Sequence, residues 1–308
     1  NGKYCETGQK ANNNYIPLAE LERIKARRRA KGLPDDELSC RMELIDRRIR
    51  ESELIRRARD SKAGGRPDVL PIFTAPEWTF KLPGTPLTPK QRDQIITHYQ
   101  RLSKHHPDML IIPGSMVTNC GTRKKPKIQA EAVAVYNGKI VKRTRKANEG
   151  MDVDGYTKYD TALKKDVKLK PDKDFDWLER DDSATAKSLY KGDSSVFEIE
   201  GMTFSLEICA DHISSRARWD AKRRDGRGVD VQILISDGAN IDQACKAAHP
   251  GGVVISNDAT VYSDEAKGAS GGVRIAGRAG EYEKTTTAEY FEDTGRVQTS
   301  DPLEIYRQ

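Results

Sequence analysis

Cys209 is the residue whose surroundings most favour chemistry. Phe204, Leu206 and Ile208 alternate with polar residues along an expected strand that ends at this cysteine, and residues 210–212 open an expected helix. A thiol at such a junction lies near backbone amides at the helix N-terminus, which lower its pKa and can stabilise an oxyanion. Cys209 is therefore a candidate nucleophile. A buried structural cysteine stays open as the alternative, since free cysteines are among the most buried residues.

Glu77 has the position of a general base. The apolar run of residues 69–73 leads almost directly into this carboxylate, which lies between Pro76 and Trp78. A carboxylate at the end of a buried strand is poorly solvated, and poor solvation raises its pKa toward the range of a general base. A loop glutamate that caps the next element is the competing interpretation.

Lys146 ends the second strand of an expected hairpin that turns at Asn137-Gly138. Five of the last eight residues of this strand are basic, so composition alone does not distinguish one lysine from the others. The order of a glutamate, a lysine and a cysteine at three separate strand ends is what favours a shared site.

The segments that carry these three residues resemble the signature segments of the nitrilase superfamily of carbon–nitrogen hydrolases. They occur in the family's order and comprise residues 73–77, 136–146 and 206–211. The resemblance covers roughly residues 68–277. It implies an α-β-β-α sandwich of nitrilase type in which Glu77, Lys146 and Cys209 form a catalytic triad.

In the mechanism that the resemblance implies, Cys209 attacks the carbon of an amide or, less readily, a nitrile. Glu77 takes the thiol proton and passes it to the leaving amine, while Lys146 and backbone amides hold the developing negative charge. Water then cleaves the thioester and releases a carboxylic acid, with no metal ion or organic cofactor. Four neighbouring residues are candidates for the oxyanion hole or the pocket: Trp78, Ala210, Asp211 and His212.

The resemblance also implies a second carboxylate shortly after the lysine. Asp154 and Glu149 are the candidates, with Asp152 as their rival. All three lie in a segment, residues 147–192, that is rich in lysine, aspartate and glycine and separates two expected hairpins. We expect this charged insertion to be a lid, a binding insertion or a mobile segment at the mouth of the site.

The elements that must position these residues indicate an α/β protein. A helix is expected from Thr88-Pro89, and hairpins alternate with short apolar runs that are typical of strands covered on both faces. These runs are residues 69–73, 109–112, 231–235 and 252–256. Before them, helical spacing of apolar residues predicts a charged helical hairpin. The chain is expected to divide into this extension, residues 1–62, and a nitrilase-like domain, residues 63–308.

Composition limits the classes of function. The 308 residues carry a formal net charge of +6, and residues 18–62 hold 14 basic and 10 acidic residues. These acidic neighbours weaken the field that phosphate binding needs, which argues against nucleic acid as a partner. No run approaches the roughly 18 apolar residues of a membrane span, and no signal-like segment opens the chain. The five cysteines form no C-x-x-C pair. We expect a cytoplasmic protein, with homodimerisation open, that acts on a small-molecule or side-chain amide.

Two other functions stay open. Cys209 could pair with His212 or His249 in a Cys-His thiol hydrolase or transferase, whose activity would survive replacement of Glu77 and Lys146. A catalytically inactive binding or scaffold protein could keep the same fold for its shape. Cys209 would then react with electrophiles no faster than an ordinary exposed thiol.

Overall fold

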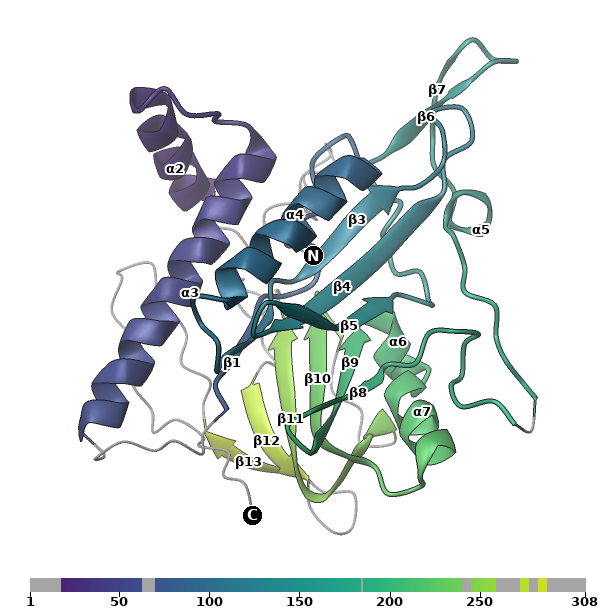
Figure 1. Ribbon diagram of the computed structural model, residues 1–308. Helices are drawn as coiled ribbons and strands as arrows, with labels where there is room; N and C mark the ends of the chain where they lie inside the picture. Colours follow the sequence, from purple (N-terminus) through teal and green to yellow (C-terminus); the bar gives the residue numbers. More distant parts are fainter. Residues whose placement is uncertain are drawn as a thin grey trace.

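The computed structural model describes residues 18–62, 70–183, 185–239, 245–258, 272–276 and 282–286. At its centre are two β-sheets (Figure 1). The first sheet has the order β1-β2-β4-β3, with β5 also paired to β4, and the second has the order β13-β12-β11-β10-β9-β8. The strands of the first sheet are β1 (Ile72–Thr74), β2 (Leu110–Ile112), β3 (Ser115–Asn119), β4 (Ile128–Tyr136) and β5 (Lys139–Arg145). Those of the second are β8 (Val196–Ile199), β9 (Met202–Ile208), β10 (Val229–Ser236), β11 (Ala248–Asp258), β12 (Gly272–Ala276) and β13 (Tyr282–Thr286).

Strand direction determines where side chains from distant parts of the sequence meet. β10 runs parallel to both β9 and β11, and β1 runs parallel to β2. The C-terminal ends of neighbouring parallel strands lie at one edge of a sheet, which is where α/β proteins commonly place their sites. The β4–β5 hairpin turns at Asn137 and Gly138, whose φ angles are 47° and 75°. This turn confirms the prediction from the Asn-Gly pair.

The two sheets face each other across one hydrophobic cluster. Every second residue along each strand points into this cluster, so the apolar residues at these alternate positions form the interface between the sheets. The first sheet contributes Leu110, Ile112, Ala132 and Ala134, and the second contributes Phe197, Phe204, Leu206, Ile208, Val231, Ile233, Ile235 and Val253. All of these side chains are buried.

Helices cover the outer face of each sheet. α4 (Pro89–Ser103) packs on the first sheet through Ile95, Ile96 and Tyr99. Its N-terminus has the predicted cap, because Thr88 and Gln91 form a capping box and Pro89 is the first helical residue. On the second sheet, α6 (Ala210–Ile213) is followed by α7 (Arg216–Arg224), which buries alanines against β10 and β11. The predicted α-β-β-α sandwich is therefore present.

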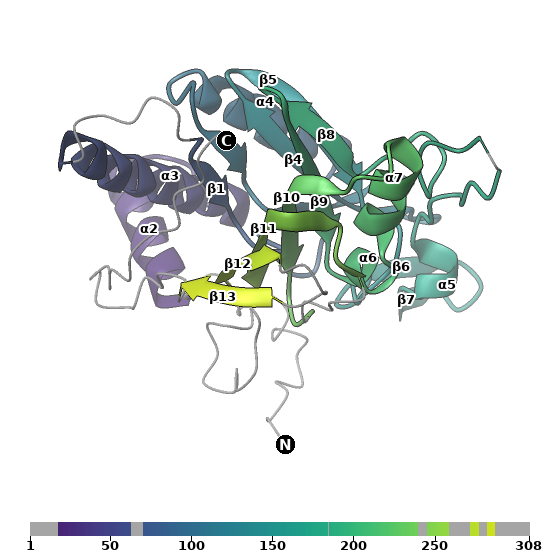
Figure 2. The same ribbon diagram turned by 90° about the horizontal axis from the view of Figure 1, so that it is seen from below.

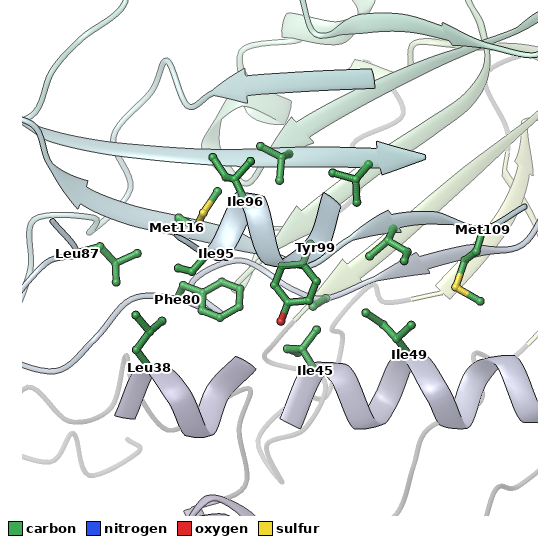
Figure 3. Packing of buried hydrophobic residues seen from close by; sticks show 14 residues of the cluster. Leu38, Ile45, Ile49, Phe80, Leu87, Ile95, Ile96, Tyr99, Met109 and Met116 are labelled. Carbon is green, nitrogen blue, oxygen red and sulfur yellow. The ribbon is translucent and has the colours of Figure 1, made fainter. Parts of the chain in front are cut away.

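An N-terminal helical hairpin packs beside this sandwich. α2 (Leu18–Ala30) and α3 (Glu37–Lys62) form it, and Figure 2 shows both helices lying away from α6 and α7. Leu38, Ile45 and Ile49 of α3 point toward Phe80 and Tyr99 and share their cluster (Figure 3). The hairpin is thus continuous with the core of the sandwich.

Charged residues of the hairpin are mostly paired with one another. Arg28 Nη1 lies 2.6 Å from Glu43 Oε2, and Arg48 Nη2 lies 3.0 Å from Glu20 Oε2. Such pairs account for a segment that is rich in both signs of charge. Arg41 is different because it is buried and donates to Thr79 O at 2.8 Å, which fixes the backbone just after Glu77.

The charged insertion, residues 147–192, is not a loop throughout. It contains β6 (Thr157–Asp160), β7 (Lys165–Lys168) and the short α5 (Pro171–Asp174), and the β6–β7 hairpin projects beyond the sandwich (Figure 1). Apolar side chains anchor its base in a cluster that includes Trp78: Val153, Tyr156, Leu169 and Phe175. The base of the insertion is therefore packed against the sandwich, and its predicted role at the mouth of the site stays a prediction.

Several sequence interpretations fall on residues outside the described ranges. These include residues 1–17 of the predicted extension and residue 69 of the apolar run 69–73. Among the helices that the structure describes, none is long and apolar enough to cross a membrane.

Candidate active site

Glu77, Lys146 and Cys209 meet although they are far apart in sequence. Lys146 directly follows β5, Cys209 directly follows β9, and Glu77 lies on the turn after β1. Lys146 Nζ donates to Glu77 Oε1 at 2.6 Å, and the Cys209 thiol hydrogen-bonds to the same carboxylate. Glu77 and Lys146 are buried, whereas Cys209 is partly exposed. The three predicted residues therefore form one site, of which Cys209 is the partly exposed member.

The backbone at Cys209 adopts an uncommon conformation. Its φ and ψ angles are 45° and −106°, a region that residues with a side chain rarely occupy. Two hydrogen bonds hold the turn, because Cys209 N donates to Ile235 O at 2.9 Å and His212 N donates to Cys209 O at 2.9 Å. The turn redirects the chain from β9 into α6 and leaves the thiol facing Glu77.

The prediction of a lowered thiol pKa is wrong. Burial raises the pKa of the Cys209 thiol well above its usual value, and the adjacent Glu77 carboxylate raises it further. Lys146 and the Asp237 backbone N–H oppose these effects without cancelling them. α6 has only four residues, so it supplies little of the helix dipole that the sequence suggested. The resting thiol is protonated and needs a base before it can react.

Glu77 has the properties of that base. Burial raises the pKa of Glu77 to about 7, with Lys146 lowering it and the charge of Asp152 raising it. The direction agrees with the sequence prediction. Its second oxygen, Oε2, accepts from Asp237 N at 3.2 Å. Both oxygens are held, so the carboxylate has one orientation toward the thiol.

The second carboxylate on Lys146 is Asp152, not Asp154 or Glu149. Asp152 is fully buried, and its Oδ2 accepts from Lys146 Nζ at 2.8 Å. The same side chain accepts from Gly150 N at 3.1 Å, while Asp154 is exposed and Glu149 accepts from Val153 N at 3.3 Å. The tight turn at residues 150–152 brings Asp152, six residues along the chain, back onto the lysine.

Trp78 supports this carboxylate from the opposite side. Its Nε1 donates to Asp152 Oδ1 at 2.9 Å, and its ring is buried. Lys81 lies over the Trp78 ring, with Nζ 4.1 Å from the centroid, and donates to Met151 O at 2.5 Å. Burial lowers the pKa of Lys81. Lys81 is not among the predicted site residues, although a lysine four residues after Glu77 in an apolar context is a usable signal.

Asp211 joins the turn at Cys209 to the segment after Lys146. Its carboxylate accepts from Ala147 N at 3.0 Å, from Asn148 N at 2.9 Å and from Arg216 Nη1 at 2.8 Å. These contacts hold α6 against the end of β5, so Asp211 positions the lysine and the cysteine relative to each other. Nothing in these contacts directs Asp211 toward an oxyanion.

Ala210 and His212 flank Asp211 in different environments. Ala210 is partly exposed, and a Cβ atom placed on Gly150 would lie 3.5 Å from its Cβ and 3.2 Å from Lys146 Nζ. Only glycine fits there without crowding the lysine. His212 is buried, and its Nδ1 lies 2.9 Å from Glu207 Oε2, which also accepts from Gln232 Nε2 at 2.8 Å.

The histidines of the Cys-His interpretation have other partners. His212 Nδ1 interacts with Glu207, and His249 Nε2 lies 2.9 Å from Asp230 Oδ1 at the start of β10. In contrast, the contacts of Glu77 with both Cys209 and Lys146 join all three members of the implied triad. Within the described ranges, no group of three or more histidine, cysteine or acidic side chains is arranged to hold a metal ion.

The topology and the site define the class of fold. Two facing sheets between helices, with glutamate, lysine and cysteine at three strand ends, give the chain the nitrilase-type α-β-β-α sandwich that its sequence segments imply. No family model and no curated protein matches the chain.

Solved structures with a similar fold include three distant proteins. A mutant of the Nesterenkonia AN1 amidase from the nitrilase superfamily is 15% identical, with a TM-score of 0.46 over 80% of this chain and 79% of that one. Saccharomyces cerevisiae Nit3, a member of branch 10 of the same superfamily, is 13% identical, with a TM-score of 0.38 over 68% of each chain. Glutamine-dependent NAD+ synthetase from Acinetobacter baumannii is 14% identical, with a TM-score of 0.40 over 78% of this chain and 40% of that one.

Proposed function

We propose that this protein hydrolyses a non-peptide carbon–nitrogen bond, in a small-molecule or side-chain amide, through a thioester on Cys209. One observation carries the proposal: the buried Glu77 carboxylate contacts both the Cys209 thiol and the Lys146 ammonium. A nucleophile, a base and a fixed positive charge are the three groups that acyl transfer needs.

The reaction begins with proton transfer from the thiol to Glu77 as sulfur attacks the carbonyl carbon. Because the thiol pKa is raised, this transfer accompanies attack instead of preceding it. Lys146 Nζ donates to the carbonyl oxygen as it becomes negative. Glu77 then gives its proton to the nitrogen of the tetrahedral intermediate, the carbon–nitrogen bond breaks, and ammonia or an amine leaves with the thioester still on Cys209.

Hydrolysis of the thioester uses the same groups in reverse order. Glu77 takes a proton from water, the hydroxide oxygen attacks the thioester carbon, and Lys146 again stabilises the negative oxygen. The carbon–sulfur bond breaks, sulfur recovers the proton held by Glu77, and a carboxylic acid is released. Atoms balance with water as the only co-reactant.

Lys146 is suited to this role because it stays charged. Burial lowers the pKa of Lys146, but the negative charges of Asp152 and Glu77 outweigh this effect and raise the pKa well above its usual value. An ammonium between two carboxylates keeps its position without reorganisation during the reaction, and this preorganisation is what makes electrostatic stabilisation effective.

A direct test combines turnover with trapping of the intermediate. The full chain is incubated with a panel of primary amides, carbamoyl compounds and glutamine-containing peptides, and ammonia release is measured. Rapid acid quenching and mass spectrometry then look for an acyl group on the peptide that contains Cys209. Ammonia release with an adduct on this peptide supports the proposal. Turnover without any adduct, or an adduct on Cys120 instead, contradicts it.

The pH dependence of kcat/KM is a second expected result. Glu77 acts as a base only when ionised, and its pKa is raised to about 7. A group with a raised pKa stays protonated to higher pH, so activity is expected to rise with pH by about tenfold per unit below this value and to level off above it. Initial rates between pH 5 and 9 measure this limb. An acid limb centred near the ordinary pKa of a glutamate would show that Glu77 is not the base.

Asp152 and Asp154 give a matched pair for the second carboxylate. Asp152→Asn removes a charge that contacts Lys146 Nζ at 2.8 Å, and we expect kcat to fall about 100-fold, on the order of the loss of one aligned electrostatic contact. Asp154→Asn changes an exposed side chain in the same turn and should leave kcat within about twofold. Equal effects of the two substitutions on kcat would remove Asp152 from the mechanism.

A further inference from the structure

Asp237 lies beside the nucleophile, although no part of the mechanism above uses its side chain. It follows β10, whose last apolar residue, Ile235, pairs with Ile208 just before Cys209. Its backbone N–H contacts Glu77 Oε2 at 3.2 Å and also hydrogen-bonds to the Cys209 sulfur. The carboxylate is therefore carried at the edge of the reacting centre.

The Asp237 carboxylate has unused acceptor capacity. Its Oδ1 is buried and has no hydrogen-bond partner within the described part of the chain, and the side chain forms no ion pair there. Burial and the neighbouring Asp258 raise the pKa of Asp237 to about 6, with Lys81 and Lys146 opposing them. A buried acceptor without a donor costs free energy, and a ligand that supplies a donor or a positive charge removes this cost.

Charge is distributed unevenly across the site. Lys81 and Lys146 are both buried, and their ammonium groups contact Met151 O and the carboxylates of Glu77 and Asp152. Asp237 and Glu149 are instead partly exposed.

Glu149 lies next in the chain to Gly150, which is near the residue after Cys209. Gly150 packs against Lys146 Nζ and Ala210, so residue 149 lies beside the turn at Cys209. Glu149 is partly buried, and burial together with the charge of Asp152 raises the pKa of its carboxyl group. Two partly exposed acidic residues, on the segment after β5 and directly after β10, thus lie near the turn at Cys209.

We propose that the amide substrate carries a cationic group, an ammonium or a guanidinium, which Asp237 binds with support from Glu149 while the amide carbon faces Cys209. This assignment rests on the proposed hydrolase function. Electrostatic complementarity of this kind discriminates strongly between substrates of opposite charge, because an anionic group would face two carboxylates in a partly dehydrated place.

Amides of matched length and different charge test the assignment. 5-Aminopentanamide, hexanamide and glutaramic acid are compared by kcat/KM for ammonia release. We expect the cationic amide to exceed the neutral one by about tenfold and the anionic one by more. Asp237→Asn is expected to reduce the cationic-to-neutral ratio by about tenfold, and Glu149→Gln by a smaller factor. Asp225→Asn, at an exposed position after α7, is the control and should leave the ratio unchanged.

Two results overturn the assignment and leave the hydrolase function intact. The first is hydrolysis without a preference for the cationic amide. The second is a cationic-to-neutral ratio of kcat/KM that Asp237→Asn does not change, although the variant melts like the wild-type chain. A different result identifies failure of the function itself: no amide of any charge is hydrolysed and no acyl adduct forms, and the assignment then falls with it.

Thiol labelling gives a readout that does not need turnover. Positively charged 2-aminoethyl methanethiosulfonate and negatively charged 2-sulfonatoethyl methanethiosulfonate are compared by their rates at Cys209, each divided by the rate with free 2-mercaptoethanol. We expect about a tenfold excess for the cationic reagent that falls toward one in Asp237→Asn. Equal normalised rates in the wild-type chain overturn the assignment. Cys120, which is exposed, serves as the reference thiol in the same peptide map.

Discussion

Replacing Cys209 by alanine is expected to abolish hydrolysis, with a fall in kcat of about 10⁴-fold or more. Without sulfur no thioester forms, and the remaining groups can only polarise the bound amide. Among the described residues, Cys209 carries the thiol that hydrogen-bonds to Glu77, so its loss leaves the base without a side-chain nucleophile. Ammonia release and mass spectrometry of the quenched reaction measure turnover and the adduct.

Two controls make the Cys209→Ala result specific. Cys120→Ala removes an exposed thiol outside the site and should leave kcat unchanged. Thermal melting of Cys209→Ala should stay close to that of the wild-type chain, since loss of a sulfur atom at a partly exposed position creates only a small cavity. Residual turnover within about tenfold of wild type would show that Cys209 is a structural cysteine after all.

Replacing Lys146 by methionine is expected to cost about 10³-fold in kcat and also to destabilise the fold. The substitution removes the charge that holds the substrate oxyanion. The expected fall in kcat is on the order of the loss of one oxyanion contact at a preorganised site. It also leaves Glu77 and Asp152 buried without their shared ammonium, and breaking a buried pair in this way costs roughly 3–5 kcal/mol. The two carboxylates will respond by taking up protons, so Glu77 is no longer a base at neutral pH.

Activity and urea unfolding are measured together for this variant. Lys146→Arg keeps a positive charge and is expected to recover much of the stability but little of the turnover, because a planar guanidinium cannot occupy the position of Nζ. Lys139→Met, on an exposed residue at the start of the same strand, is the matched control. Survival of hydrolysis in Lys146→Met would instead favour the Cys-His interpretation, in which neither lysine nor glutamate is needed.

Local sequence signals were sufficient where the chemistry follows from neighbouring residues. The Thr88 cap and the Asn137-Gly138 turn were predictable, because turn and cap geometry depend on a few adjacent side chains. Alternating and continuous apolar runs likewise indicated β9 and β10. These runs placed Glu77, Lys146 and Cys209 at strand ends before any contact between them was known.

Local sequence signals could not decide which of the acids after Lys146 is the second carboxylate. Glu149, Asp152 and Asp154 lie within six residues, and composition treats them alike. The turn at residues 150–152 and the indole of Trp78 decide that Asp152 faces the lysine. The turn is local, but the indole comes from a segment 74 residues away, and no local pattern carries that contact.

The sequence by itself determined the class of fold, the strand ends that carry a base, a lysine and a thiol, and the charged character of the N-terminal helices. Only the tertiary structure decided that the thiol pKa is raised and that Asp152 and Lys81 join the site. The physical reason is that propensity and periodicity are properties of neighbours along the chain. Burial and electrostatic interactions depend instead on which distant segments pack together, and they set the protonation state of every group in the site.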